Sequence, residues 1–486
     1  MQEILELIRV LEQHNIRFTQ ADSEADDNLL RLLNEFRNGQ YAPDTAVGST
    51  PGASADYSDL ETAQRLLQER LGQAVKNFVT ELEQFTDVQQ AHLECQKLWL
   101  NVRMLSGQNA AILAIDLAGH ILNIAAKFDF TLLAMDVAMY LRMQCCMQYF
   151  DSETCAQAEA KYQFFRQTLD AEFRAEKMYS DMTARWWGGH ASEESLQQSA
   201  KANLKELEIL MATFSSSKLH LYGNLIQVQQ YLFAQELPAA AAHCEKSIRY
   251  FLGKPYQARD PLQVFYYHLL LCSIHLCDAE RGKKAAYLCL GLVGEHVSNQ
   301  FKIRELLVLL FLHSRNYQEA ANLFCSVTAD SRFAFLPGAL RANWSIFGAY
   351  LALAGIVSPD EIAIRFERKE ATTHPGTLLI AEYIRLLQEK RLEAARNRVP
   401  ELEHFLFRRN AAPTASRTSV FIQMLLLVSE ADFQPDGVSR LVAGHLEHLQ
   451  TLPLDLATPT LELEVLPYED LWQIVLQTLE AGANRQ

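Results

Sequence analysis

Apolar residues recur at a helical spacing along most of this 486-residue chain. From about residue 59 to about residue 450 they return every three or four positions, and short polar or Gly/Pro turns interrupt them at intervals. Positions three and four apart share one face of an α-helix, so the pattern predicts amphipathic helices. Because such helices bury their apolar faces against one another, we expect an all-α fold built from helix hairpins.

The start of the chain follows a different pattern. Residues 1–39 predict two short helices, and Ser23 stands as an N-cap three residues before Asp26 at the start of the second. Residues 40–58 are rich in Gly, Pro, Ser and Ala, which is typical of a loop or tether. We therefore expect a small N-terminal helical lobe, joined to the rest by this tether.

The middle of the chain divides into two parts. Residues 59–215 predict helical hairpins, including an unusually long helix near 152–184, and residues 216–452 predict shorter repeats. In these repeats a small alanine follows each of four turns, where it would allow close contact between helices. The four alanines are Ala240, Ala285, Ala320 and Ala395.

Residues 453–486 predict a tail and a capping helix. The sequence LELEV at 461–465 alternates like a short strand. Pro467 then opens a last helix, with Glu469 and Asp470 in its first turn, where acidic side chains are favourable.

Two stretches resemble known families. In FLHSRNYQEAANLFCSV, the spacing of Phe311, Tyr317, Ala320 and Phe324 resembles the tetratricopeptide (TPR) repeat. Residues 90–142 resemble a bacterial family of long TPR-like proteins with no assigned activity. The residues that carry this second likeness are Glu94, Lys97, Trp99, Val102, Gly107, Phe128, Phe130, Thr131, Leu133, Ala134, Asp136 and Arg142. The resemblance implies a right-handed TPR-like α-solenoid.

The composition is that of a folded protein and disfavours nucleic acid as a partner. Apolar residues make up 49% of the chain and charged residues 21%, a balance that excludes a disordered chain. The formal net charge of −15 repels phosphate backbones over most of the surface. A protein or peptide partner is therefore expected.

Cysteine usage and hydropathy predict a cytoplasmic protein. Nine cysteines, mostly among apolar residues, are typical of reduced and buried thiols. The N-terminal segment lacks the basic and apolar regions of a signal peptide. The longest purely apolar run, Leu306–Leu312, is much shorter than the roughly 20 residues that cross a bilayer. No membrane association is expected.

One arrangement has metal-ligand spacing. His268, Cys272 and His275 share a helix face at i, i+4 and i+7, and imidazole and thiolate suit zinc. The surrounding residues are apolar and no CxxC pair supplies further ligands, which favours core packing and leaves zinc as the alternative. Cys145 and Cys146 are adjacent and point about 100° apart on a helix, so buried thiols are the better interpretation. We expect no metal and no cofactor.

Catalytic patterns are weak, so we do not expect an enzyme. Ser215 and Lys218 form S-x-x-K without the companion motifs of serine acylases, which indicates a helix N-cap cluster. The R-x(4–6)-H spacing of helical HEPN ribonucleases occurs five times, a modest excess over what the composition gives by chance. The pairs are Arg9/His14, Arg185/His190, Arg368/His374, Arg398/His404 and Arg440/His445.

Two surfaces are candidates for partner binding. Segment 364–417 is basic within an acidic chain and predicts a stripe that attracts an acidic peptide; the alternative is a solvated face with internal ion pairs. Its candidate residues are Arg391, Arg396, Arg398, Arg408 and Arg409. Trp186 and Trp187 end the long helix, and large aromatic residues often anchor interfaces, although burial is an equal alternative.

These observations favour a non-catalytic scaffold or adaptor that binds a protein or peptide partner in a solenoid groove. The alternative is a regulatory protein that senses a ligand or peptide and uses the N-terminal lobe as its output. That lobe is acidic, which weakens a DNA-reading role. A HEPN-like ribonuclease is the third hypothesis.

Overall fold

The structure is a computed structural model that describes residues 87–107, 111–148, 152–188, 192–294, 296–357, 374–409, 416–456 and 462–483. The chain divides into two compact units, Met1–Glu94 and Cys95–Gln486. Only residues 87–94 of the first unit are described, so the lobe and tether predicted for residues 1–58 lie outside the described residues.

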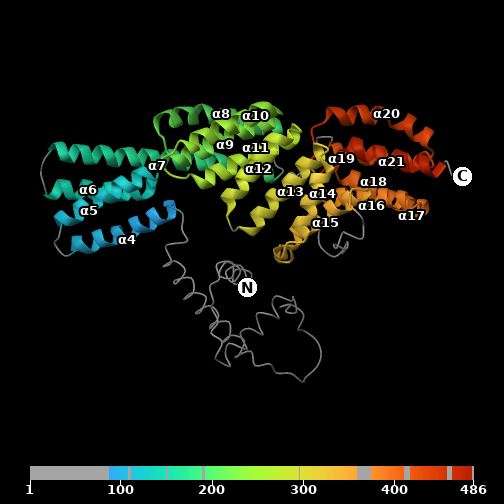
Figure 1. Ribbon diagram of the computed structural model, residues 1–486. Coiled ribbons are helices and arrows are strands. Elements are labelled where there is room, and N and C mark those ends of the chain that lie inside the picture. The colour runs from blue at the N-terminus through green and yellow to red at the C-terminus, as the bar shows by residue number, and fades with distance from the viewer. Residues whose placement is uncertain are drawn as a thin grey trace, which may run out of the picture. The chain divides into compact units, whose positions relative to one another are not determined.

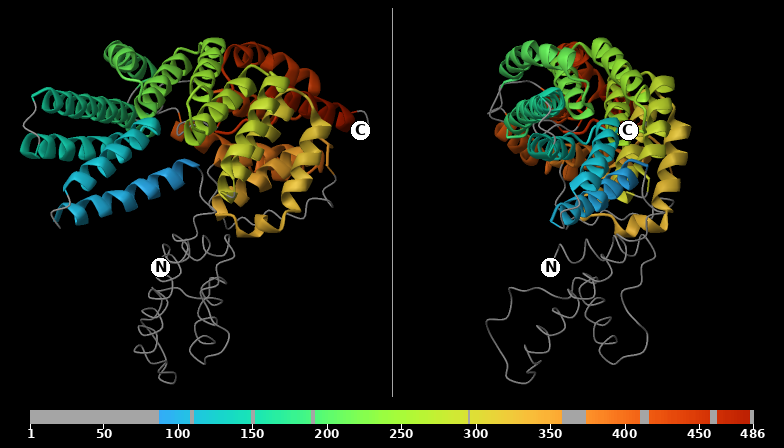
Figure 2. Two further views of the ribbon diagram at one scale, coloured as in Figure 1. Left: turned by 60° about the vertical axis from the view of Figure 1, so that its left-hand side comes forward. Right: turned by 90° about the vertical axis from the view of Figure 1, so that its left-hand side faces the viewer.

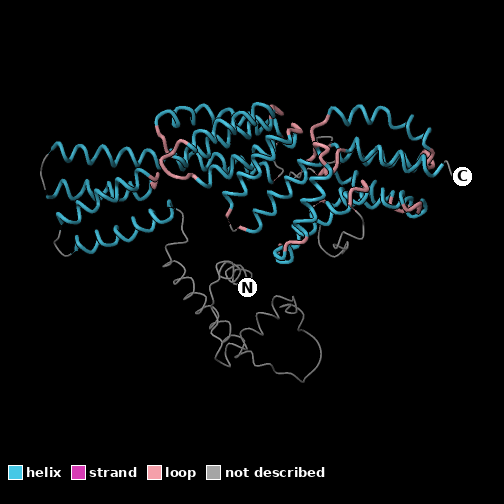
Figure 3. The backbone as a smooth tube through the Cα atoms, in the orientation of Figure 1, coloured by secondary structure: helices cyan, strands magenta, loops and turns pink. Residues whose placement is uncertain are grey.

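The regular secondary structure of the described residues is helical throughout, as the periodicity predicts (Figures 1 and 3). The helices are α4 (Asp87–Gly107), α5 (Ala111–Lys127), α6 (Thr131–Gln148), α7 (Ser152–Trp187), α8 (Glu193–Thr213), α9 (Ser217–Phe233), α10 (Leu237–Leu252), α11 (Arg259–His275), α12 (Ala279–Val293), α13 (Val297–His313), α14 (Tyr317–Thr328), the 3-10 helix η2 (Ser331–Phe335), α15 (Gly338–Leu353), α16 (Pro375–Gln388), α17 (Leu392–Arg396), α18 (Val399–Arg409), α19 (Arg417–Glu430), α20 (Pro435–Thr451) and α21 (Tyr468–Ala483). The long helix is confirmed as α7, with 36 residues.

A recurring turn connects consecutive helices. In six turns a non-glycine residue adopts a positive φ between 52° and 59°. In one of them Arg315 donates its N–H to Leu312 O at 3.1 Å, and the next N–H, of Asn316, reaches Phe311 O at 2.8 Å. This is a Schellman motif, which satisfies the last carbonyls of a helix and ends it. The six residues are Asp129, Gln235, Cys277, Arg315, Lys390 and Asp432.

A small residue follows each of these six turns at the same distance. Five positions after the residue with positive φ stand Ala134, Ala240, Gly282, Ala320, Ala395 and Gly437. The four alanines in this set are fully buried. Three of the alanines predicted from the sequence therefore hold equivalent positions. In the remaining repeat Gly282 takes that position, and Ala285, also buried, lies almost one turn later.

Helices that are neighbours in sequence pack against one another without a break from α5 to α14. In Figures 1 and 2 the green to yellow helices of this part of the chain form one packed group. The buried apolar side chains form three clusters. One joins α4, α5 and α6, a second joins α7, α8 and α9, and the largest runs from α9 to α21.

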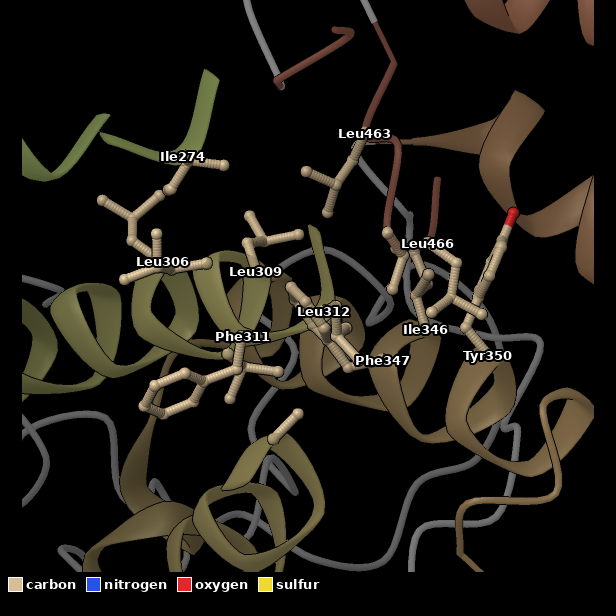
Figure 4. Packing of buried hydrophobic residues seen from close by; sticks show 14 of the residues in the cluster. Ile274, Leu306, Leu309, Phe311, Leu312, Ile346, Phe347, Tyr350, Leu463 and Leu466 are labelled. Carbon is tan, nitrogen blue, oxygen red and sulfur yellow. The ribbon is translucent and has the colours of Figure 1, made fainter. Parts of the chain in front are cut away.

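Helix α13 is buried on all sides, which explains the longest apolar run. Every residue from Leu306 to Leu312 is buried. Figure 4 shows Phe347 and Tyr350 of α15 and Leu463 and Leu466 of the tail around this part of the core. Within the described residues, no helix combines the length and apolar character needed to cross a membrane.

The tail does not form the predicted strand. Among the described residues its β-pairing is one isolated antiparallel bridge, between Leu456 and Leu463. Glu462 and Glu464 are as deeply buried as the leucine between them, so the alternation does not separate a core face from a solvent face. The strand prediction was wrong because these polar groups bond to helix ends instead of to a neighbouring strand. The helix predicted after Pro467 is confirmed as α21.

Three carboxylates of the tail cap the N-termini of three helices. At the start of α19, Asp455 Oδ2 accepts the Thr418 N–H at 2.8 Å and its hydroxyl at 2.6 Å. At the start of α16, Glu462 Oε2 accepts the Thr377 N–H at 3.2 Å. At the start of α21, Glu464 Oε1 accepts the N–H of Tyr468 at 3.0 Å. Negative charge is favourable at a helix N-terminus, where backbone N–H groups lack partners.

A buried arginine pairs with one of these carboxylates, Glu464. Arg417 donates from Nε and Nη2 to the two oxygens of Glu464, at 2.8 and 3.0 Å, and from Nη2 to Glu469 at 2.7 Å. His313 Nε2 forms a 2.8 Å hydrogen bond with the backbone oxygen of Glu464, which lies 151 residues later in the chain. We call Asp455, Glu462, Glu464 and Arg417 the C-terminal clasp, because together they tie α16, α19 and α21 to the end of α13.

Candidate functional site

The predicted basic stripe is largely neutralised by nearby acids. Arg391 lies 3.4 Å from Glu389, and Arg396 is paired with Asp432. Arg398 is paired with Glu382 at 3.2 Å and with Glu401 at 2.6 Å. The side chains of Arg408 and Arg409 lie outside the described residues. Exposed pairs of this kind contribute only about 0–1 kcal/mol, so a carboxylate of a partner can exchange with the internal ones.

The two tryptophans of the predicted anchor have different environments. Trp186 is half-buried, and its ring meets that of Phe233 edge-on at a centroid distance of 5.5 Å. Trp187 is 58% exposed at the C-terminal end of α7. Trp186 therefore belongs to the core between α7 and α9, and Trp187 is the one that a partner can reach.

A cleft lies between α7 and α8, close to these tryptophans in sequence. Its volume is about 480 Å³, and its lining combines methionines with charged and polar side chains. Ser195 and Ser199 of α8 hold Arg185 of α7, with its guanidinium nitrogens 2.9 and 3.4 Å from their hydroxyl oxygens. The lining residues are Met178, Asp181, Met182, Ala184, Arg185, Ser199 and Asn203.

An exposed apolar face on α6 was not anticipated from the sequence. Leu132, Met139, Met143 and Met147 are 62, 38, 51 and 67% exposed. Their spacings of seven, four and four residues place them on one side of the helix. The opposite side of α6 packs into the core. Because apolar residues occur on both sides, the sequence pattern indicates a fully buried helix and hides this face.

Helix α4 extends the apolar surface beside α6. Leu100 and Met104 of α4 are 61% and 57% exposed. Two contacts join α4 to α6: Trp99 Nε1 donates to Asp136 Oδ2 at 3.0 Å, and Arg103 is ion-paired with the same oxygen at 3.2 Å. Trp99 and Asp136, two residues that carry the family resemblance, thus have a structural role here.

The histidines and cysteines with metal-like spacing lie within the core. Burial lowers the pKa of both His268 and His275 to about 4. A hydrogen bond with Cys272, together with burial, raises the pKa of the Cys244 thiol. Among the described residues, no three or more His, Cys, Asp or Glu side chains are grouped in a way that could hold a metal ion.

The S-x-x-K cluster is a helix N-cap, as predicted. Ser216 caps α9 by accepting the Leu219 N–H. The neighbouring Ser217 hydroxyl donates to Asp129 at 2.7 Å, and Lys254 is ion-paired with the same carboxylate at 2.9 Å. Lys218, the lysine of the motif, is ion-paired with Glu176 of α7 at 2.7 Å. This junction fastens the turn before α6 to the start of α9.

In the two Arg/His pairs that lie wholly within the described residues, each arginine has a partner other than the histidine. Arg398 is held by Glu382 and Glu401, while His404 is exposed. Arg440 Nε donates to the Asp436 backbone oxygen at 3.4 Å. The other three pairs each include a residue outside the described part of the chain.

Comparison with known proteins gives no relative. No protein-family model, no curated protein and no solved structure matches this chain.

Proposed function

We propose that the protein is a non-catalytic scaffold whose helix hairpins stack as a right-handed TPR-like α-solenoid and bind a protein partner. The recurring turns support the stacking, since a hydrogen bond that spans five residues and a small residue, alanine or glycine, return in all six of them. Packing of successive helices supports it as well, because each helix from α5 to α13 contacts the next one in the chain.

The exposed apolar face of α4 and α6 is the observation that carries the binding function. Six large apolar side chains there are between 38% and 67% exposed: Leu100, Met104, Leu132, Met139, Met143 and Met147. The four on α6, which lie in one row, present on the order of 400 Å² of apolar surface, within the range of the largest patch on a soluble monomer. Such patches are often functional.

The shape of this face suits a helical partner. The row on α6 extends over four turns, or about 22 Å, which matches the apolar face of one amphipathic helix. Methionine side chains are flexible and polarisable, and they adapt to differently shaped apolar partners. We therefore propose that α4 and α6 bind an amphipathic helix of another protein.

Affinity purification of the full chain with mass spectrometry tests this proposal. A Met143→Glu/Met147→Glu variant places two charges in the row and is expected to lose the specific partners. Ile209→Glu is the matched control, because Ile209 is 70% exposed on α8 and lies apart from the row. Both variants must keep the helical circular dichroism of the parent. Recovery of the same partners with the Met143→Glu/Met147→Glu variant would refute the proposed interface.

A further inference from the structure

The α7–α8 cleft contains an arginine with no acidic partner among the described residues. Arg185 bonds only to the hydroxyls of Ser195 and Ser199. Other arginines in this acidic chain commonly pair with carboxylates; on the same helix Arg174 lies 3.1 Å from Glu206. A guanidinium that neutral groups hold in place, and that no acid neutralises, keeps its attraction for an incoming anion.

The geometry of Arg185 suits a carboxylate. A guanidinium carries five N–H donors in a rigid plane, and the two serines occupy two of them. The remaining donors can bind a carboxylate, which pairs with arginine in a planar, often bidentate arrangement. Asp181, the acid that lines the cleft, is already engaged by Lys177 at 2.8 Å. Of the two charged residues that line the cleft, Asp181 is therefore engaged and Arg185 is the one available to an anion.

Apolar groups beside Arg185 define the rest of the ligand. Met182 is buried and Met178 is half-buried, so the cleft offers sulfur and methylene surface next to the guanidinium. Trp187, two residues after Arg185, offers an exposed ring at the end of the same helix. A volume of about 480 Å³ has room for a few side chains of a peptide.

We propose that the α7–α8 cleft binds an acidic segment of a protein partner, with an Asp or Glu carboxylate on Arg185 and a neighbouring apolar side chain against Met178 and Met182. The inference rests on the proposed scaffold function, because it specifies the chemistry of a partner. It concerns a different surface from α4 and α6, so the two proposals can fail separately.

The probe is an array of immobilised hexapeptides, each with one Asp or Glu flanked by apolar residues. A second array carries the same peptides with Asn in place of Asp and Gln in place of Glu. The full-length protein is expected to prefer the acidic peptides. Arg185→Gln should lower the affinity for them by about tenfold, since a hydrogen bond to a charged group is worth on the order of 1.5–3 kcal/mol. Arg174→Gln, on the same helix, is the matched control and should bind as the parent does.

Two results would overturn the proposal: equal binding of acidic and amide peptides by the parent protein, or equal loss of binding in the Arg185→Gln and Arg174→Gln variants. Arg185 is exposed, so its substitution is expected to leave the fold intact, and a thermal melt of each variant verifies this. If the parent protein shows no preference for acidic peptides while Met143→Glu/Met147→Glu still removes partners, the proposed role of the cleft is refuted and the proposed scaffold function is not.

Discussion

Two glycines of helix α12 give opposite predictions for the same substitution. A Cβ added at Gly282 would lie 2.5 Å from Leu310 Cδ2 and 2.9 Å from Ser273 Cβ. Leu310 belongs to α13 and Ser273 to α11, and both are fully buried. A Cβ added at Gly291 would meet nothing within 4 Å. The first glycine is therefore required by close packing of three helices, and the second is not.

The expected free energies follow from two opposing effects. Alanine is favoured over glycine within a helix by about 0.5–1 kcal/mol, which applies in full to Gly291→Ala. At Gly282 the same gain is opposed by overpacking, which costs about 1–3 kcal/mol because the Ser273 Cβ is fixed to the backbone of α11. We expect Gly291→Ala to stabilise α12 and Gly282→Ala to destabilise it by about 1–2 kcal/mol net.

Native-state hydrogen exchange is the appropriate assay, because a long helical array does not unfold in a single two-state step. In the Gly282→Ala variant, the backbone amides of α11, α12 and α13 should exchange faster than in the parent protein. In the Gly291→Ala variant, the amides of α12 should exchange more slowly. If Gly282→Ala protects these helices as Gly291→Ala does, then the close approach of α11, α12 and α13 is not as described, and Gly282 has room for a methyl group, as the equivalent positions with alanine do.

Three further predictions concern the tryptophans, the basic stripe and pH. Trp186→Ala should lower the free energy of local unfolding of α7 and α9 by about 2 kcal/mol through lost packing on Phe233, whereas Trp187→Ala should change it by less than about 0.5 kcal/mol in the same hydrogen-exchange assay. If the basic stripe binds an acidic peptide, charge reversal of Arg391, Arg396 and Arg398 to Glu should remove partners from a pull-down. If the set of recovered partners is unchanged, the stripe is a solvated face. Burial lowers the pKa of four histidines to about 4, so they accept protons in the unfolded chain below about pH 6.5 but not in the folded chain, and stability is lost as pH falls toward 4. Burial also raises the pKa of Asp455 to about 6 and raises the pKa of Glu172 and of Glu464, so these three carboxyls gain stability over part of the same range, but they are outnumbered by the four histidines and by His220, whose pKa burial also lowers. The melting temperature should therefore be lower at about pH 5 than at about pH 7.5, and an equal or higher value would contradict the assignment of neutral histidines, which are His243, His268, His275 and His313.

Local signals in the sequence predicted much of the fold. The period of apolar residues predicted helices, and the predicted end of the long helix near residue 184 is three residues short of its observed end at Trp187. Pro467 and the acidic residues after it marked the start of α21. These features depend on neighbouring residues alone, because helix periodicity and capping are properties of a short stretch of chain.

Features that depend on distant partners were missed. Arg417 was counted within a basic segment, yet it is buried against Glu464, 47 residues later. The glutamates of LELEV had the alternation of a strand, and only the helix ends that they cap reveal their role. The apolar face of α6 was missed for a related reason: the sequence does not indicate which side of an all-round apolar helix lacks a neighbour.

The C-terminal clasp has a consequence for synthesis of the chain. Glu462 is 85 residues beyond Thr377, whose backbone N–H it caps. At about 5–20 residues per second, a ribosome adds this glutamate roughly 4–17 s after the threonine. During that interval α16 lacks its cap, and the tail that covers part of α13 has not been made. The C-terminal part of the array therefore completes its fold only after the tail has been made, and a premature stop codon shortly before Asp455 would leave helices made much earlier without their caps.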